Sequence, residues 1–266
     1  EPNVVSFAGG LPAPDAFPSR ELVVGLADQA LTKYPDLLQY QSTEGLLPLR
    51  EAAVDYLRGQ NLLVEGVDNV MVTTGSQGAL NGIGAVFTGR PRKIIVEGPG
   101  YLGAFQAFNL YGAEYLAAPM HRDGMDLDVA ESYLRNGLAK VIYGVPNFQN
   151  PTGLTMSLEK RWRLADMLQT YGAIFIEDDP YGRIRFKGEH LPPVQRFAPD
   201  NVVYLTTFSK LFAPGLRIGL VEAPEWIIKA LVKAKQGVDL FTGSLDQGII
   251  LQYLAGGHLQ QQLPRI

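Results

Sequence analysis

The chain has 266 residues, 46% hydrophobic and 19% charged, which is typical of a globular protein with a sizeable core. A net charge of −4 argues against a nucleic-acid partner, because binding a phosphate backbone needs a basic surface. The chain contains no cysteine, its three histidines lack ligand spacing, and neither a membrane-spanning run nor a signal-peptide pattern is present, so we expect no disulfide, no metal site, no membrane partner and a cytoplasmic location.

The hydrophobic period changes repeatedly along the chain between the spacing of a helix and that of a strand. We expect the first forty residues to be irregular. In chain order, the pattern then predicts a helix at 46–59, a strand at 69–74, a helix at 76–88, a strand at 93–97, a helix at 101–111, strands at 114–118 and 141–145, a helix at 157–171, strands at 173–177, 202–206 and 218–221, and helices at 225–236 and 244–254. This alternation predicts an α/β fold with a mostly parallel sheet.

Lys210 is the residue with the clearest chemical setting. It follows a predicted strand, stands beside Thr207 and Ser209, and is followed by Arg217. Burial and the positive charge of Arg217 should lower the pKa of the lysine and expose its lone pair. The amine could then form a Schiff base, while the hydroxyls and the guanidinium hold a phosphate. The ordinary alternative is a solvated surface lysine.

Two more segments end predicted strands with polar residues. The strand at 173–177 delivers Asp178 to the edge of the sheet where ligands of α/β proteins bind. A carboxylate there could pair with a protonated ring nitrogen, although a turn residue is an equally good interpretation of Asp178 alone. Asn150, before Pro151, is by itself a common turn signal.

A candidate anion site follows the strand at 69–74. Gly75, Ser76 and Gln77 open the next predicted helix, where free N–H groups and the helix dipole favour an anion. We expect Ser76 and the amide of Gln77 to contact a phosphate, with charge-assisted bonds from Arg217 and from Thr207 or Ser209. A simple N-cap is the alternative role for Ser76.

Taken together and in this order, these segments resemble the fold-type I pyridoxal-phosphate (PLP) aminotransferases. The resemblance is to the class I/II branch that includes 2-aminoadipate and kynurenine aminotransferases. It implies a three-layer α/β sandwich, a homodimer and the transfer of an amino group from an amino acid to a 2-oxo acid, with 2-oxoglutarate as the expected acceptor. The reaction would run through a Schiff base on Lys210, which also moves the substrate proton.

The resemblance also implies a role for each matching residue. Asp178 would face the pyridine nitrogen, and Tyr181 and Asn150 would donate to the ring oxygen. Tyr40 would reach the phosphate of the neighbouring subunit, and the segment of Gly9 and Gly10 would lie beside the substrate carboxylate, with Asn150. The catalytic residues are then Lys210, Asp178 and Tyr181, and the cofactor contacts are Gly75, Ser76, Gln77, Tyr101, Asn150, Asp178, Tyr181, Thr207, Ser209, Lys210, Arg217 and Tyr40.

Tyr101, expected to stack on the ring, lies in a segment with a competing interpretation. Gly98, Gly100 and Gly103 match the dinucleotide fingerprint, and Asp123 follows at a suitable distance. The other motifs have no place in a dehydrogenase, so we favour the stacking role.

Two alternatives keep the family but change the function. The first is an aminotransferase-like effector domain of a MocR/GntR-type transcription regulator, whose DNA-binding part would precede residue 1. The sequence of residues 147–153 is closer to that of the free enzymes. The second is a PLP-dependent lyase or decarboxylase.

The expected domain organisation follows the same resemblance. Residues 1–39 are expected to form an N-terminal arm or part of a small domain, and residues 40–266 the PLP-binding large domain. The rest of the small C-terminal domain, with the arginine that clamps the substrate carboxylate, is expected to lie outside the sequence. We therefore expect this chain to be part of a longer enzyme.

Overall fold

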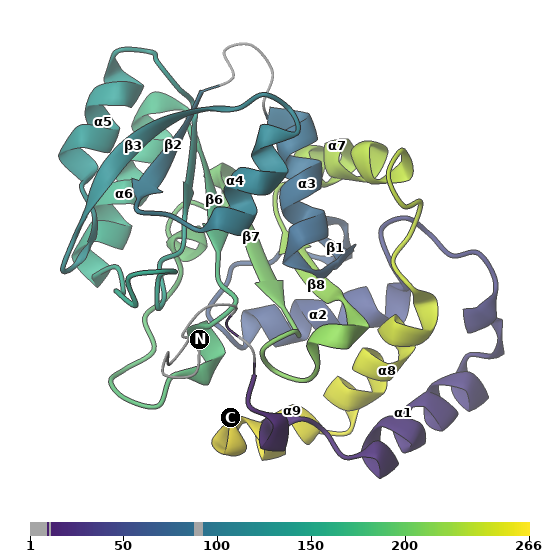
Figure 1. Cartoon of the computed structure of the whole chain (residues 1–266). Coiled ribbons are helices and arrows are strands. Elements are labelled where there is room, and N and C mark those ends of the chain that lie inside the picture. Colours follow the sequence, from purple (N-terminus) through teal and green to yellow (C-terminus); the bar gives the residue numbers. More distant parts are fainter. Residues whose placement is uncertain (1–9, 11, 88–92) are drawn as a thin grey trace, which may run out of the picture.

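A computed structural model describes residues 10, 12–87 and 93–266, and it contains a single eight-stranded sheet in the order β1-β8-β7-β6-β5-β2-β3-β4 (Figure 1). The strands are β1 (Val70–Thr74), β2 (Lys93–Gly98), β3 (Glu114–His121), β4 (Gly124–Met125), β5 (Val141–Gly144), β6 (Ile174–Asp178), β7 (Val202–Thr207) and β8 (Ile218–Glu222). The α-helices are α1 (Arg20–Lys33), α2 (Leu47–Arg58), α3 (Gly75–Phe87), α4 (Leu102–Asn109), α5 (Leu127–Arg135), α6 (Leu158–Tyr171), α7 (Glu225–Gln236), α8 (Ser244–Ala255) and α9 (His258–Gln262).

Helices cover both faces of the sheet and give three layers (Figure 1). One hydrophobic core joins the sheet to α1, α2, α5, α6 and α8, and a second joins it to α3, α4 and α7. Successive residues of β7 point to opposite cores: Val202 and Tyr204 to the first, Val203 and Leu205 to the second. Since both faces are buried here, the central strands β5, β6 and β7 are largely apolar runs, as expected for a covered parallel sheet. The predicted three-layer α/β sandwich is confirmed.

Five neighbouring strands, β3, β2, β5, β6 and β7, run parallel, so their carboxyl ends meet at one edge. β8 runs antiparallel to both β7 and β1. The connection from β7 to β8 contains only a short 3-10 helix at Pro214–Leu216, which is too short for the crossover that a parallel neighbour requires. That short connection keeps the segment with Lys210 and Arg217 at the carboxyl edge.

The expectation of an irregular first forty residues is wrong for residues 20–33, which form α1. The Ser19 hydroxyl caps this helix by accepting a hydrogen bond from the amide of Leu22 at 3.2 Å. Leu26 and Ala30 are buried, and the helix packs against α8. The partner that stabilises α1 is therefore far away in the sequence, so the local pattern does not reveal it.

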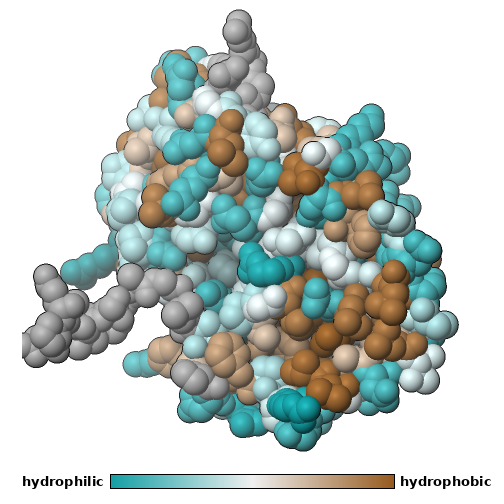
Figure 2. All heavy atoms as spheres, turned by 45° about the vertical axis from the view of Figure 1, so that its right-hand side comes forward, coloured by the Kyte–Doolittle hydropathy of each residue, from teal (hydrophilic) through white to brown (hydrophobic). Residues whose placement is uncertain are grey.

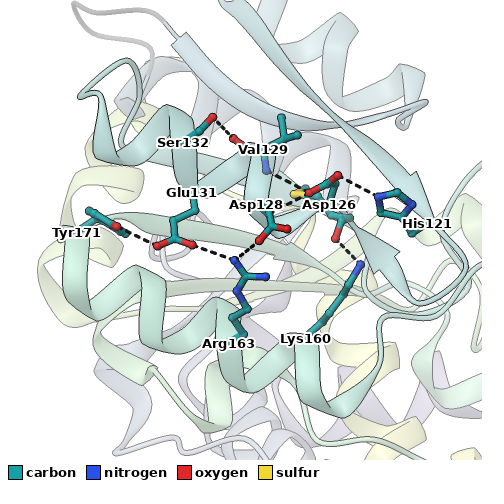
Figure 3. A network of polar contacts seen from close by, with 10 residues as sticks. His121, Asp126, Asp128, Val129, Glu131, Ser132, Lys160, Arg163 and Tyr171 are labelled. Atoms are coloured by element: carbon teal, nitrogen blue, oxygen red, sulfur yellow. Dashed lines mark hydrogen bonds and ion pairs between the residues drawn. The ribbon is translucent and has the colours of Figure 1, made fainter.

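α5 was also not predicted, and polar contacts attach it to its neighbours (Figure 3). Its cap, Asp126, accepts hydrogen bonds from the amides of Asp128 and Val129 at 3.0 and 3.1 Å. Arg163 of α6 bridges two acids of α5 at 2.5 and 2.9 Å, and the other contacts are His121–Asp126, Lys160–Asp123 and Tyr171–Glu131. Exposed pairs of this kind contribute little energy each, so we assign the network a structural role.

Glu222, the last residue of β8, leads to a prediction on stability. It is 3% exposed, and its Oε2 has no hydrogen-bond partner among the described residues. Burial raises its pKa to about 8, against the hydrogen bond from Gln195, which lowers it. The unfolded chain releases this proton near pH 4.5 and the folded chain only near pH 8, so ionisation costs the fold stability as the pH rises through this window.

We expect Glu222→Gln to leave the melting temperature nearly unchanged at pH 4.5 and to raise it increasingly up to pH 8. Each 1 kcal/mol of recovered stability corresponds to about 2–4 °C. Thermal melts across this pH range measure the difference. Glu51→Gln, a change at an exposed position of α2, serves as the control. A difference between Glu222→Gln and the native chain that does not grow with pH contradicts the prediction.

Candidate active site

A cavity of about 360 Å³ opens at the edge of the sheet where the parallel strands end. Segments that follow β1, β2, β5, β6 and β7 contribute to its wall. The lining residues are Gly10, Ser76, Gln77, Tyr101, Val145, Asn150, Asp178, Pro180, Tyr181, Thr207, Ser209, Lys210, Pro214 and Arg217. The structure thus brings together nearly all the residues that the sequence singles out.

Lys210 lies in the turn after β7 and is half-buried, with its amine in the cavity. Its Nζ donates a hydrogen bond to the carbonyl oxygen of Gly10 at 2.7 Å. Burial, and secondly the positive charge of Arg217, lower the pKa of the amine. A lower pKa increases the neutral fraction, which is the form that can attack a carbonyl carbon. Gly9 lies outside the described residues.

Asp178 ends β6 and is 2% exposed. Its Oδ2 accepts a hydrogen bond from the Tyr143 hydroxyl at 2.8 Å, while its Oδ1 has no partner within the described part of the chain. Burial raises the pKa of this carboxyl to about 7. Asp178 lines the cavity, and its unpaired oxygen suits a ligand that carries a cationic N–H group, because such a donor satisfies the oxygen and favours the ionised acid.

The neighbouring acid, Asp179, has a different role. Its Oδ1 accepts from the amide of Gly182 at 2.8 Å, and its Oδ2 from Tyr204 and Asn147, each at 3.0 Å. These bonds hold the turn after β6 in place. They also distinguish the two aspartates, because the partners of Asp179 are all protein groups whereas Asp178 keeps a free oxygen.

Tyr181 projects from this turn into the cavity and is hydrogen-bonded to the side chain of Asn150. Burial raises the pKa of the Tyr181 hydroxyl, so the hydroxyl stays protonated and able to donate. The two side chains come from turns after β6 and β5, and they place two donors side by side on the same wall.

The start of α3 and Arg217 form the most positive part of the cavity. Gly75 has φ +67°, and a Cβ built there would lie 2.4 Å from Nη2 of Arg217, so only glycine lets the guanidinium approach the helix start. Arg217 Nη1 donates to the Ser209 hydroxyl at 3.3 Å, and the Thr207 hydroxyl donates to the same oxygen at 3.0 Å. Hydroxyls, helix N–H groups and a guanidinium on one wall suit a phosphate.

Gln77 uses its side chain elsewhere: Nε2 donates to the carbonyl of Gly103 at 2.9 Å and ties α3 to α4. Tyr101 caps α4, and a Cβ at Gly103 would meet the Tyr101 ring at 2.5 Å. A Cβ at Gly100 would meet the Phe105 ring at 2.7 Å. Two of the three fingerprint glycines therefore make room for aromatic rings, and the ring of Tyr101 occupies the start of α4 that a dinucleotide would need.

Of the predicted residues that the structure describes, Tyr40 alone lies far from this cavity. Its side chain is 77% exposed and packs edge-on against Phe241, with the ring centroids 6.0 Å apart. Both rings line a separate groove of about 470 Å³. Its expected contact concerns a neighbouring subunit and stays a prediction.

Sequence reasoning missed Tyr143. It lies on β5, in register with Ile176 of β6, and this places its hydroxyl within reach of Asp178. A tyrosine in the middle of a fully buried apolar strand needs a partner for its hydroxyl, and this was the available signal. Among the described residues, no group of three histidine or acidic side chains could hold a metal ion.

Comparison with known proteins identifies the family. The model of the family described as aminotransferase class I and II matches residues 14–261. Aromatic-amino-acid aminotransferase 1 of Thermococcus litoralis is 40% identical over 272 residues, which cover 99% of this chain and 65% of that protein. The chain thus spans just under two thirds of that relative.

A solved structure agrees. That of LysN, the alpha-aminoadipate aminotransferase of Thermus thermophilus in complex with N-(5'-phosphopyridoxyl)-L-leucine, superposes with a TM-score of 0.90 at 38% identity, covering 97% of this chain and 66% of that one. The HTH-type regulator YisV of Bacillus subtilis is less similar, at 30% identity over 98% of this chain and 54% of that protein. The chain therefore belongs to the class I and II aminotransferase family.

Proposed function

We propose that this chain binds pyridoxal 5'-phosphate and forms the cofactor-binding part of an aminotransferase that moves an amino group from an amino acid to a 2-oxo acid. One observation carries the proposal: Lys210 and Asp178, whose Oδ1 has no partner among the described residues, line the same cavity. They are the two groups that a pyridoxal ring needs, one at its aldehyde and one at its nitrogen.

When bound, the cofactor supplies an electrophilic aldehyde and a ring that accepts the electron pair left at the α carbon of the substrate. The chain supplies the binding groups. Asp178 would hold the proton on the ring nitrogen, and Arg217 and the start of α3 would hold the phosphate. Tyr181 and Asn150 would donate to the ring oxygen, and Tyr101 would stack on the ring.

Lys210 has the remaining role, that of moving the proton. Its lowered pKa leaves a larger neutral fraction, so Nζ can take the proton from the α carbon of the substrate and deliver it to the C4′ carbon of the cofactor. The carbonyl oxygen of Gly10, 2.7 Å from Nζ, shows how close this backbone comes to the amine, and we propose the same segment beside the substrate carboxylate.

The amino donor is proposed to carry a large apolar side chain. A second cavity of about 840 Å³ adjoins the first and shares Tyr101, Asn150 and Tyr181 with it. Much of its remaining lining is apolar: Leu102, Phe148, Pro151, Ile184 and Phe186. The Thermococcus relative is named an aromatic-amino-acid aminotransferase, which agrees with this choice.

We propose a homodimer that works in the cytoplasm. Figure 2 shows a broad apolar area on the face that includes α1 and α8. Leu38, 78% exposed, lines the groove of Tyr40 and Phe241, so a second copy covering this groove would bury apolar surface and bring Tyr40 towards another subunit.

Among the described residues no helix has the length and apolar character to cross a membrane. The domain boundary near residue 39 also stays a prediction, although Leu26 and Leu37 are buried in the first core.

An absorption spectrum of the purified protein with pyridoxal phosphate tests the function. We expect a band near the visible edge, borohydride reduction that attaches the cofactor to Lys210, and conversion of the band by aromatic amino acids. A protein that shows neither the band nor the covalent attachment contradicts the proposal. Binding without conversion by any amino acid favours the effector-domain alternative, and release of carbon dioxide or an alkene favours the decarboxylase or lyase.

A further inference from the structure

Gln149 is a buried glutamine beside the turn that carries Asn150. Its side chain is among the least exposed polar groups in the chain, at 1%. Nε2 donates to Oε2 of Glu97 at 3.0 Å and to the carbonyl of Pro99 at 2.9 Å. Oε1 accepts from the amide and the hydroxyl of Thr152 at 2.9 and 2.6 Å. The amide therefore uses both donors and both acceptor positions, and this fixes its orientation.

Glu97, on β2, is the acid that receives this amide. It is 2% exposed, and its two oxygens also accept from the amide of Val145, each at 3.2 Å. Both partner groups are donors, which suits an acceptor-only carboxylate, whereas burial raises the pKa of the acid to about 8. Glu97 does not line the cavity of Lys210, and neither does Gln149.

These bonds connect the loops that follow the neighbouring strands β2 and β5, and both loops contribute a residue to the candidate cofactor site. Pro99 precedes Tyr101 in the loop after β2, and Thr152 follows Asn150 in the loop after β5. The planar side-chain amide of Gln149 contacts both loops. If one loop shifts and carries the amide with it, the hydrogen bonds from the amide to the other loop are broken. Since the group is buried, each broken bond leaves an unsatisfied polar atom, and this makes the arrangement rigid.

We propose that Gln149 and Glu97 are positioning residues that hold Asn150 at a fixed distance from Tyr101. This inference rests on the proposed function for its consequence: Asn150 donates to the ring oxygen and competes for it with the protonated nitrogen of Lys210. Without the pair, Asn150 moves, the ring oxygen holds that proton more tightly, and the pH at which the bound cofactor changes colour rises.

Gln149→Met tests this, because methionine keeps the volume and removes all four side-chain bonds. We expect the midpoint of the spectroscopic pH titration to rise by about 0.5–1 pH unit, the equivalent of roughly one lost hydrogen bond. Asn150→Ala should shift it in the same direction and at least as far. Without cofactor, amide hydrogen exchange at Thr152 should become faster, because its partner Oε1 is gone.

Gln195→Met is the matched control. Gln195 is 0% exposed, and its side chain bonds both the amide and the carbonyl of Leu63, at 2.9 and 2.7 Å, away from this cavity. We expect it to lower stability without moving the midpoint or the exchange of Thr152. If Gln149→Met does not fold, Glu97→Met replaces it, since methionine removes the acceptors of the Val145 and Gln149 amides; the same upward shift is expected.

The outcomes separate this inference from the proposed function. A native protein that binds the cofactor, with a midpoint unchanged in the Gln149 or Glu97 variant, overturns the positioning role. If the native protein binds no cofactor, the proposed function fails and hydrogen exchange decides. If the amide of Thr152 then exchanges faster in the Gln149 variant but not in the Gln195 control, the pair does hold the Asn150 loop in place. Unchanged exchange in the Gln149 variant overturns that role.

Discussion

Lys210→Ala should abolish the absorption band of the bound cofactor near the visible edge and lower the rate of amino-group transfer by roughly 10²–10⁴-fold or more. The variant lacks the amine that attaches the cofactor and moves the substrate proton. Alanine also leaves the carbonyl of Gly10 without the donor that it has at 2.7 Å. The spectrum and the turnover rate, measured on the same preparation, check both effects.

Lys233→Ala is the control, because Lys233 is an exposed lysine of α7 and lies outside the cavity. It should leave spectrum and rate unchanged. A Lys210→Ala protein with the native band would show that another amine holds the cofactor. A band that is lost while the rate stays near the native value would separate attachment from proton transfer and contradict the double role.

Asp178→Asn should weaken cofactor binding by about 10–150-fold at pH 8, the equivalent of one charge-assisted hydrogen bond. Asparagine keeps the shape and can still accept from Tyr143, but it cannot carry the negative charge that faces the ring nitrogen. Titration of the protein without cofactor, followed by absorbance, gives the two dissociation constants.

The pH dependence of this effect has a defined sign. Since burial raises the pKa of Asp178 to about 7, the native acid is mostly neutral at pH 6 and mostly ionised at pH 8. The difference between native and variant affinity should therefore shrink as the pH falls. Tyr143→Phe removes the bond that lowers this pKa and should shift the same dependence to higher pH. A difference that is constant from pH 6 to pH 8 would contradict the assignment.

Most of the strands longer than two residues were predictable because their runs are largely apolar and bounded by turns. The central strands are buried on both faces, so burial itself produces the sequence signal, whereas β3 is mostly exposed and carries a weaker one. The two-residue β4 and the helices α1 and α5 were not predicted. The stabilising partner of α1 is α8, more than 200 residues away, and α5 has only nine residues and begins directly after β4, at its N-cap Asp126.

The candidate site was predictable to the extent that its residues follow strands. Lys210 and Asp178 come directly after or at the end of apolar runs, and parallel strands bring such ends to one edge. Tyr143 and Gln149 gave no comparable signal. Their roles depend on which polar atom lies within hydrogen-bond distance of each side chain, and the packing of neighbouring strands and loops decides that.

The order of apolar runs and polar strand ends, by itself, determined the layered α/β fold and the kinds of residue at its carboxyl edge. Buried strands must be apolar, and parallel strands all end at the same edge, so both features can be read from short stretches of sequence. Only the tertiary structure decided that Asp179 is satisfied while Asp178 keeps a free oxygen, and that Gln149 ties two loops together. The reason is that hydrogen bonds between distant segments depend on distances of a few tenths of an ångström, which spacing along a chain does not encode.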